Sequence, residues 1–227
     1  MSIRSKLYSY EWVKSAKNRV RPLKHRLLGK NGIYWVMDEV ARSAGGPENV
    51  RTIFDIGAAT GEYAVHFLEK FPNAVVYCFE PLPAQFERLQ WRTKRFGGRV
   101  KLFNFGFYNR DGEIEFYEAD YKDASSLLGA RGGKPVKVPM RRLDDVVAGL
   151  PVTHIDFMKI DVEGVEREVI EGGMKTMENM VDNAFIEIQP SFKGYNGDHL
   201  VVFENLERIG LKFVGCFEDY FFSKKTG

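Results

Sequence analysis

Strand-like and helix-like segments alternate along the chain from residue 51 onward, and this alternation limits the possible folds more than any other feature. Short apolar runs are followed by segments whose apolar side chains recur at helical spacing, with glycine or proline at the joints. Parallel strands need a crossover connection, usually a helix, so the pattern predicts an α/β domain with a mostly parallel sheet and helices on both faces. The predicted strands lie at 51–56, 74–80, 99–105, 154–161, 183–189, 211–217 and 220–224.

Two departures from the simple alternation are visible. A helix at 33–45, ended by Gly45, Gly46 and Pro47, precedes the first strand. Residues 106–140 contain two short strand-like runs, EIEFYEA and PVKVPM, around a loop rich in glycine and serine, which predicts a small hairpin insertion. The alternation resumes with a short helix at 141–149, a helical face formed by Val165, Val169, Ile170, Met174 and Met177, and a last helix near 198–209.

The composition is that of an ordinary globular protein, with 44% hydrophobic and 28% charged residues. No stretch approaches the roughly 20 apolar residues that cross a bilayer, and no secretory signal is visible at the N-terminus. We therefore predict a cytoplasmic protein. The two cysteines lie in apolar runs and indicate neither a disulfide framework nor a zinc site.

The charge is unevenly distributed, because residues 1–30 hold nine Lys or Arg and one acid. We predict a basic helical N-terminal arm at 1–48 and a single α/β domain at 49–227. The arm either contacts an anionic surface or is a solvated helix that packs on the body or on a second subunit, which would make the protein an oligomer. The charge count names no partner, and no nucleic acid is expected.

Polar and acidic residues cluster where the predicted strands end. In a parallel sheet, ligands bind beyond these carboxyl ends, near the point where the strand order reverses. The residues concerned are Asp55, Gly57, Ala58 and Gly61 after the first strand, Glu80 and Pro81 after the second, Asn104 and Gly106 after the third, Asp161 and Glu163 after the next, and Glu187 after the one that follows.

The turn in FDIGAATGEY departs from the dinucleotide-binding pattern, which weakens a nicotinamide or flavin interpretation. A G-x-G-x-x-G turn brings bare backbone to a pyrophosphate, but Ala59 and Glu62 stand where the second and third glycines are needed. The charge of Glu62 disfavours phosphate and favours a cofactor with a cationic centre. Glu80 lies about 25 residues beyond Asp55, as does the acid that binds ribose hydroxyls in nucleoside-binding folds. S-adenosylmethionine combines adenosine, a sulfonium and an amino-acid tail, and is the predicted cofactor.

The motifs FDIGAATGEY, FEP, SSL, LDD and KIDVEG resemble the FkbM family of S-adenosylmethionine-dependent O-methyltransferases, over roughly residues 50–190. The resemblance implies a Rossmann-like class I methyltransferase fold with a seven-stranded sheet and a final antiparallel strand. It also implies methyl transfer to a hydroxyl group, often on a sugar or a natural product. One departure is Ala59, where the family usually has asparagine.

The resemblance also implies roles for single residues. Asp161 and Glu163 would face the methyl group and the acceptor, and Glu80 would bind the ribose. The implied cofactor-binding residues are Asp55, Gly57, Ala58, Gly61, Tyr63, Glu80, Pro81, Asn104, Gly106 and Asp161. The candidates for the catalytic group that accepts the hydroxyl proton are Asp161, Glu163, Glu187 and His199.

Several alternatives remain open on the sequence alone. The acceptor is a sugar hydroxyl of a glycan, glycolipid or glycosylated metabolite, or else a polyketide or another non-sugar hydroxyl; a non-catalytic nucleoside-binding module is the third alternative. Lys159 lies in an apolar strand and needs a carboxylate partner, either Asp161 or Glu187. Asp161 and Glu163 could hold a divalent ion, but no further ligands are suitably spaced, so no metal is assigned.

Overall fold

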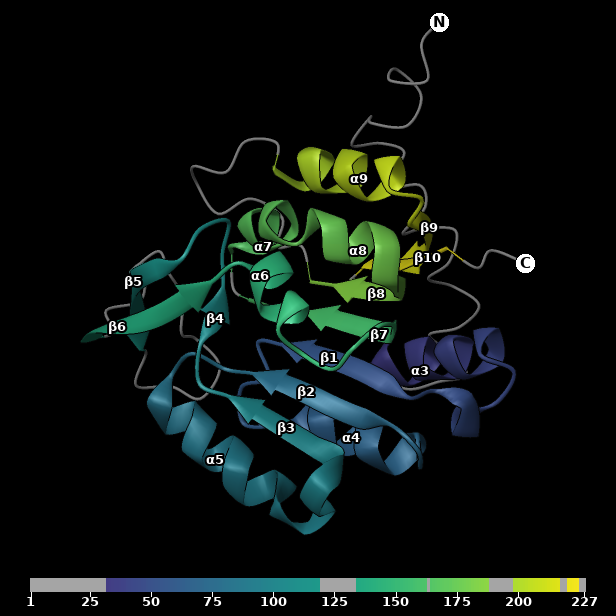
Figure 1. Ribbon diagram of the computed structural model, residues 1–227, viewed down its shortest axis with the longest axis horizontal. Coiled ribbons are helices and arrows are strands. Elements are labelled where there is room, and N and C mark those ends of the chain that lie inside the picture. Colours follow the sequence, from purple (N-terminus) through teal and green to yellow (C-terminus); the bar gives the residue numbers. More distant parts are fainter. Residues whose placement is uncertain (1–31, 119–133, 163, 188–197, 217–219, 225–227) are drawn as a thin grey trace, which may run out of the picture.

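The computed structural model describes residues 32–118, 134–162, 164–187, 198–216 and 220–224 (Figure 1). Its centre is a seven-stranded sheet in the order β3-β2-β1-β7-β8-β10-β9. β10 runs antiparallel to both of its neighbours, whereas the pairs among β3, β2, β1, β7 and β8 are parallel. The strands are β1 (Thr52–Ile56), β2 (Val75–Phe79), β3 (Val100–Phe103), β7 (Ile155–Ile160), β8 (Val181–Ile186), β9 (Lys212–Cys216) and β10 (Tyr220–Ser223). The predicted Rossmann-like sheet is confirmed.

Helices cover both faces of this sheet because side chains along each strand point alternately to the two sides. Phe54 and Ile56 of β1 pack in one apolar cluster with α6, α7, α8 and α9, and Ile53 packs in a second cluster with α3, α4 and α5. The helices are α3 (Gly32–Ser43), α4 (Glu62–Lys70), α5 (Pro83–Thr93), α6 (Leu143–Ala148), α7 (Glu166–Gly172), α8 (Met174–Met180) and α9 (Asp198–Arg208), with short 3-10 helices at Pro47–Asn49 and Lys94–Arg99.

The helix predicted at 33–45 is α3, and its apolar side is part of the core. Val36 is fully buried, and the Trp35 ring meets the Phe221 ring of β10 edge-on at 5.7 Å between centroids. α3 therefore packs against the sheet although it precedes the predicted domain boundary at residue 48. That boundary stays a prediction, and the rest of the proposed arm, residues 1–31, lies outside the described residues.

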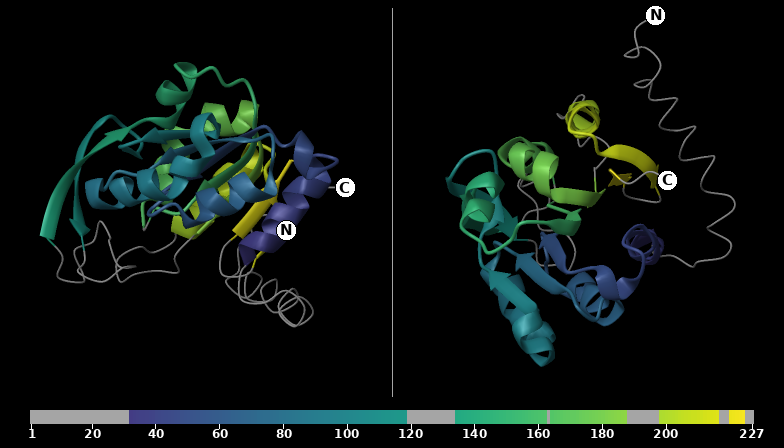
Figure 2. Two further views of the ribbon diagram at one scale, coloured as in Figure 1. Left: turned by 90° about the horizontal axis from the view of Figure 1, so that it is seen from below. Right: turned by 45° about the vertical axis from the view of Figure 1, so that its right-hand side comes forward.

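The insertion forms a second, small sheet at one end of the molecule. β5 (Gly112–Glu118) and β6 (Lys134–Arg141) pair antiparallel, and β4 (Gly106–Phe107) joins β6 in parallel. These strands extend from the end of the main sheet opposite α3 (Figure 2). Phe116, Val138 and Met140 pack with Leu82 in an apolar cluster of their own. The predicted hairpin is confirmed, and it lies over the loop that follows β2.

One helix prediction was wrong in detail, because the single helical face at 165–177 is divided between α7 and α8. The division falls at two glycines where neighbouring segments approach closely. A Cβ at Gly172 would lie 2.3 Å from the carbonyl oxygen of Tyr108, and a Cβ at Gly173 would lie 2.4 Å from Leu143. Both approaches are tertiary contacts, which helical periodicity does not contain. No helix within the described ranges is long and apolar enough to cross a bilayer.

Candidate functional site

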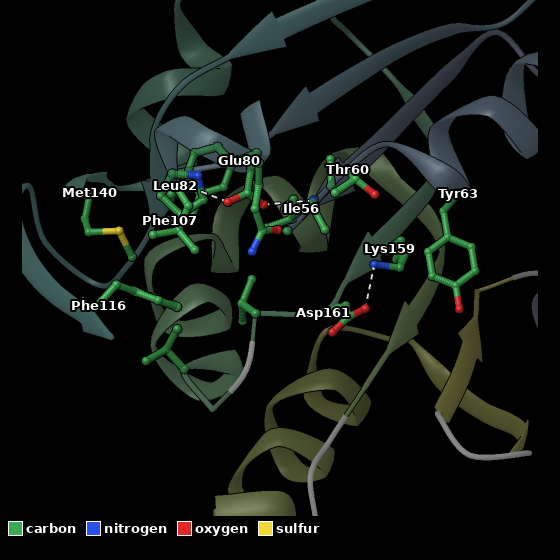
Figure 3. A pocket seen from close by; sticks show the side chains of 18 of the residues that line it. Ile56, Thr60, Tyr63, Glu80, Leu82, Phe107, Phe116, Met140, Lys159 and Asp161 are labelled. Atoms are coloured by element: carbon green, nitrogen blue, oxygen red, sulfur yellow. Dashed lines mark hydrogen bonds and ion pairs between the residues drawn. The ribbon is translucent and has the colours of Figure 1, made fainter. Parts of the chain in front are cut away.

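A cavity of about 330 Å³ opens at the carboxyl ends of β1, β2 and β7, where the strand order reverses (Figure 3). This is where ligands bind in open α/β sheets, and the volume lies in the range of small-molecule sites. The lining residues come from the turn after β1, the loop after β2, the small sheet and the end of β7. They are Ile56, Gly57, Ala58, Ala59, Thr60, Glu62, Tyr63, Glu80, Pro81, Leu82, Gln85, Gly106, Phe107, Phe116, Met140, Lys159, Asp161, Val162 and Val165.

The turn after β1 shapes the floor of the cavity. The backbone N–H groups of Gly57 and Ala58 both donate to the carbonyl oxygen of Phe79, each at 3.0 Å, which holds the turn against β2. Gly57 has φ of 76°, and a Cβ there would lie 1.8 Å from the carbonyl oxygen of Asp161. Glycine is therefore required, since the close approach of β1 and β7 leaves no room for a side chain.

The next residues of the turn lead into α4. Ala59 has φ of 47°, the only positive value outside glycine among the residues that the structure describes, and its N–H donates to Glu80 Oε2 at 2.8 Å. Asparagine tolerates this left-handed conformation better than alanine does. Ala59, which stands where the family usually has asparagine, therefore has a strained backbone conformation. Gly61 does not line the cavity; it also has positive φ, and it lets α4 pack closely on Leu89 of α5.

Glu80 is a buried carboxylate held by backbone hydrogen bonds. The Ala59 N–H donates a hydrogen bond to Oε2 at 2.8 Å, and the Leu82 N–H donates one to Oε1 at 2.9 Å. Burial raises the pKa of Glu80 to about 7, against the opposing effect of these two hydrogen bonds. Each carboxylate oxygen has a second lone pair. Glu80 can therefore accept two more hydrogen bonds from a ligand in the cavity.

Lys159 is a buried cation between two acids, one of them at the cavity wall. Its Nζ lies 2.9 Å from Asp161 Oδ2 and 3.6 Å from Asp55 Oδ1, and 4.8 Å from the centre of the Tyr63 ring. Burial alone would lower the pKa of Lys159, but Asp161 and Asp55 raise it above the ordinary lysine value. Lys159 therefore stays charged. Of the two partners that the sequence left open, Asp161 forms an ion pair with Lys159.

Asp161 presents a fixed negative charge to the cavity. Burial alone would raise its pKa, but Lys159 and a side-chain hydrogen bond with Glu187 outweigh burial and lower the pKa below the ordinary value. The carboxylate is ionised at neutral pH and is a weak base. It is suited to hold a cationic group.

Besides Gly61, two predicted cofactor-binding residues, Asp55 and Asn104, do not line the cavity. Asp55 is fully buried behind Lys159, and burial raises its pKa while Lys159 opposes the rise. Asp55 does not line the cavity, and its role in cofactor binding stays a prediction. Asn104 likewise donates from Nδ2 to the carbonyl oxygens of Glu80 and Pro81, at 2.9 and 3.1 Å, and so fixes the loop after β2.

The catalytic candidates are only partly located. Asp161 lines the cavity, and Glu187 contacts it without lining the cavity itself. Glu163 lies outside the described residues, and so does the side chain of His199, whose backbone begins α9. Both stay predictions.

Sequence reasoning missed the apolar end of the cavity. Leu82, Phe107, Phe116 and Met140 gather at one side in Figure 3, and Tyr63, Lys159 and Asp161 gather at the other, with Glu80 between them. These apolar residues come from separate segments, and only the hairpin prediction hinted that the insertion reaches the site. The cavity thus fits a ligand with an apolar ring at one end, hydroxyl groups in the middle and a positive charge at the other end.

The chain is similar in sequence to known methyltransferases. Residues 55–210 match the family described as "Methyltransferase FkbM domain". The chain is 32% identical over 142 residues to the 2-O-methyltransferase NoeI of Sinorhizobium fredii, a match that covers 55% of this chain and 58% of NoeI. It is 28% identical over 137 residues to the hexuronic acid methyltransferase AglP of Haloferax volcanii, covering 60% of this chain and 55% of AglP. The chain therefore spans less than two thirds of either relative.

Solved structures share the fold at low identity. The FkbM methyltransferase of Methylobacillus flagellatus KT aligns with a TM-score of 0.54 and 16% identity, covering 77% of this chain and 43% of that one. A putative rRNA methylase from Clostridium thermocellum aligns with a TM-score of 0.56 and 11% identity, covering 88% of this chain and 99% of that one. The family match covers more than half of the chain, and with the sheet order it identifies the chain as a member of the FkbM methyltransferase family.

Proposed function

We propose that this protein is an S-adenosylmethionine-dependent O-methyltransferase that acts on a hydroxyl group of a sugar in a glycan, glycolipid or glycosylated metabolite. The observation that carries the proposal is the cavity at the reversal of strand order, with the buried Glu80 carboxylate at its centre and ionised Asp161 at one end. Family membership supports methyl transfer. The sugar acceptor is supported by the printed names of NoeI and AglP, a 2-O-methyltransferase and a hexuronic acid methyltransferase.

The residues present fit the cofactor. Leu82, Phe107, Phe116 and Met140 would hold the adenine ring, and Glu80 would accept hydrogen bonds from the ribose hydroxyls. Asp161 would bind the positive end of the methionine part, beside the turn at Gly57 that also lines the cavity. When bound, S-adenosylmethionine supplies an electrophilic methyl group on a sulfonium.

The chain's own contribution is mainly to position the reactants. Holding two reactants in line can supply about 7 to 11 kcal/mol of the barrier. A base that takes the hydroxyl proton adds about 10²- to 10⁴-fold. The lowered pKa of Asp161 makes it a charge partner for the cofactor rather than this base. We place the base among Glu163, Glu187 and His199.

A second acceptor class has one supporting observation. The chain is 26% identical over 151 residues to the 31-O-demethyl-FK506 methyltransferase FkbM of Streptomyces tacrolimicus, covering 53% of this chain and 58% of that one, and this printed name contains 31-O-demethyl-FK506 and names no sugar. A polyketide or another non-sugar hydroxyl is therefore the second candidate acceptor.

A methyl-transfer assay would distinguish the two acceptor classes. The full chain would be incubated with methyl-labelled S-adenosylmethionine and panels of glycans, glycolipids and polyketides, and product would be measured by mass spectrometry. We expect label on a hydroxyl oxygen of a sugar. Label on a non-sugar hydroxyl would move the proposal to the second class, and cofactor binding with no transfer to any acceptor would favour the non-catalytic nucleoside-binding module.

A further inference from the structure

One histidine and two aspartates form a cluster at the start of β7 and β8, at the end of these strands opposite the cavity. Figure 1 shows the two strands side by side. His154 immediately precedes β7, Asp156 is the second residue of β7, and Asp182 is the second residue of β8. One ligand atom from each of the three residues lies within 4.8 Å of the others. None of these residues was singled out as a ligand from the sequence, since Asp182 comes from a separate strand.

The strand pairing forces the two carboxylates together. Ile155 pairs with Val181 and Phe157 with Asn183, so Asp156 lies beside Asp182 on the neighbouring strand. Like charges placed opposite one another destabilise a sheet. Both side chains are largely covered, with 13% and 15% of their area exposed. Partial burial strengthens their repulsion, and a divalent cation bound between the two carboxylates would offset it.

The third member of the cluster is an imidazole at ligand distance from both acids. His154 Nε2 lies 3.4 Å from Asp156 Oδ1 and 3.3 Å from Asp182 Oδ2. Two ligand atoms bonded to one tetrahedral zinc ion, at Zn–N and Zn–O distances near 2.1 Å, are about 3.4 Å apart. A single Nε2–H can point at only one acceptor at a time, whereas an ion between the three atoms satisfies both carboxylates.

Asp156 is hydrogen-bonded to the backbone, as carboxylates that bind metal ions usually are. Its other oxygen, Oδ2, accepts hydrogen bonds from the N–H groups of Arg51 and Thr52, at 2.8 and 2.9 Å. These bonds fix the carboxylate and leave Oδ1 directed at His154, as partners of a metal ligand do. Asp156 also joins the start of β1 to β7. Lys224 also acts electrostatically on Asp182, while its Nζ donates to the carbonyl oxygens of Met177 and Glu178.

We propose that His154, Asp156 and Asp182 bind a divalent transition-metal ion, with Zn²⁺ the best match to one imidazole and two carboxylates. His154 is half-exposed, so water completes the coordination. The ion neutralises the acid pair and ties together the first residues of β1, β7 and β8. Its role is structural, since the site and the cavity lie at opposite ends of the strands.

The test is metal binding by the full chain after dialysis against a chelator. Calorimetry with ZnCl₂ should show one ion per chain, and His154→Ala and Asp182→Asn should each weaken binding by at least about tenfold. His66→Ala is the matched control, because His66 is a histidine of α4 whose ring contacts only Tyr34 among the interactions described for it. It should bind Zn²⁺ as the wild type does.

A second readout does not depend on loss of binding. His154→Cys should bind Co²⁺ with a thiolate-to-cobalt charge-transfer absorption, because cysteine is a ligand for the same metals. Saturating Zn²⁺ should also raise the Tm of the wild type and of His66→Ala by about 4 °C or more, but not that of His154→Ala. Equal Zn²⁺ binding by wild type and His154→Ala, or no binding by either, would overturn the proposal and leave a His–Asp ion pair only.

Discussion

Glu80 is a buried carboxylate with a raised pKa at the centre of the cavity. It is 4% exposed, it is bound by two backbone N–H groups, and burial raises its pKa to about 7. The same carboxylate therefore organises the loop after β2 and is available to a ligand. Because the pKa differs between the folded and the unfolded chain, the stability of the ligand-free protein must depend on pH.

We expect the stability of the ligand-free protein to fall as pH rises from about 4.5 to about 7. The unfolded chain releases the Glu80 proton near its ordinary pKa of 4.5, whereas the folded chain keeps it until about pH 7. Deprotonation of Glu80 across this window should therefore lower the free energy of unfolding by about 3 kcal/mol. Urea unfolding at pH 5 and pH 8 would measure the change, and Glu80→Gln should remove that part of it. An identical pH dependence in the variant would exclude Glu80 as the source.

Lys159 is the residue on which the charge balance of the site depends. Without it, Asp55 and Asp161 would be left facing each other without a cation in a covered layer. We expect Lys159→Met to lower the free energy of unfolding by about 3 to 5 kcal/mol, the cost of breaking a buried pair from one side.

A surface lysine provides the comparison for this prediction. Lys70 pairs with Asp38 on the exterior, so Lys70→Met should change stability by about 1 kcal/mol or less. Both variants would be measured by urea unfolding. Equal effects of the two substitutions would mean that Lys159 does not compensate buried charge.

Among the elements, the turn between β1 and α4 has the strictest geometry. Gly57 combines positive φ with a Cβ position that the backbone of Asp161 already occupies. We expect Gly57→Ala to reduce stability and to abolish cofactor binding, because the turn must move away from β7. The matched control is Gly97→Ala, since Gly97 has φ of 53° but open space around its Cβ position. That control should cost about 1 to 2 kcal/mol and leave binding intact; if both variants bind cofactor normally, the close approach has no role in the site.

The elements that could be predicted from the sequence are those with a local signal. Strand and helix alternation predicted the sheet, and the paired runs EIEFYEA and PVKVPM predicted β5 and β6. The break at Gly172 and Gly173 could not be predicted, because its cause is the close approach of Tyr108 and Leu143 from distant segments. For the same reason, the sequence predicted Glu80 and Asp161 at the cavity but missed Phe116 and Met140.

At the scale of the whole molecule, the cavity and the proposed metal site lie at opposite ends of the same strands, and the basic N-terminal segment lies outside the described residues. The charged segment is proposed to be peripheral to chemistry. Deletion of residues 1–30 should therefore leave methyl transfer to a small soluble acceptor unchanged, with both forms compared at equal concentration of folded protein. A truncated chain that folds, by circular dichroism, but no longer transfers methyl groups would contradict this.

The central claim is that the cavity binds S-adenosylmethionine through Glu80, and calorimetric titration with S-adenosylhomocysteine tests it most directly. The wild type should bind, and Glu80→Ala should bind at least about tenfold more weakly, because hydrogen bonds to a charged group are lost. Glu87→Ala, an exposed acid on α5, should bind like the wild type. Unchanged affinity in a folded Glu80→Ala variant, or no binding by the wild type, would contradict the claim.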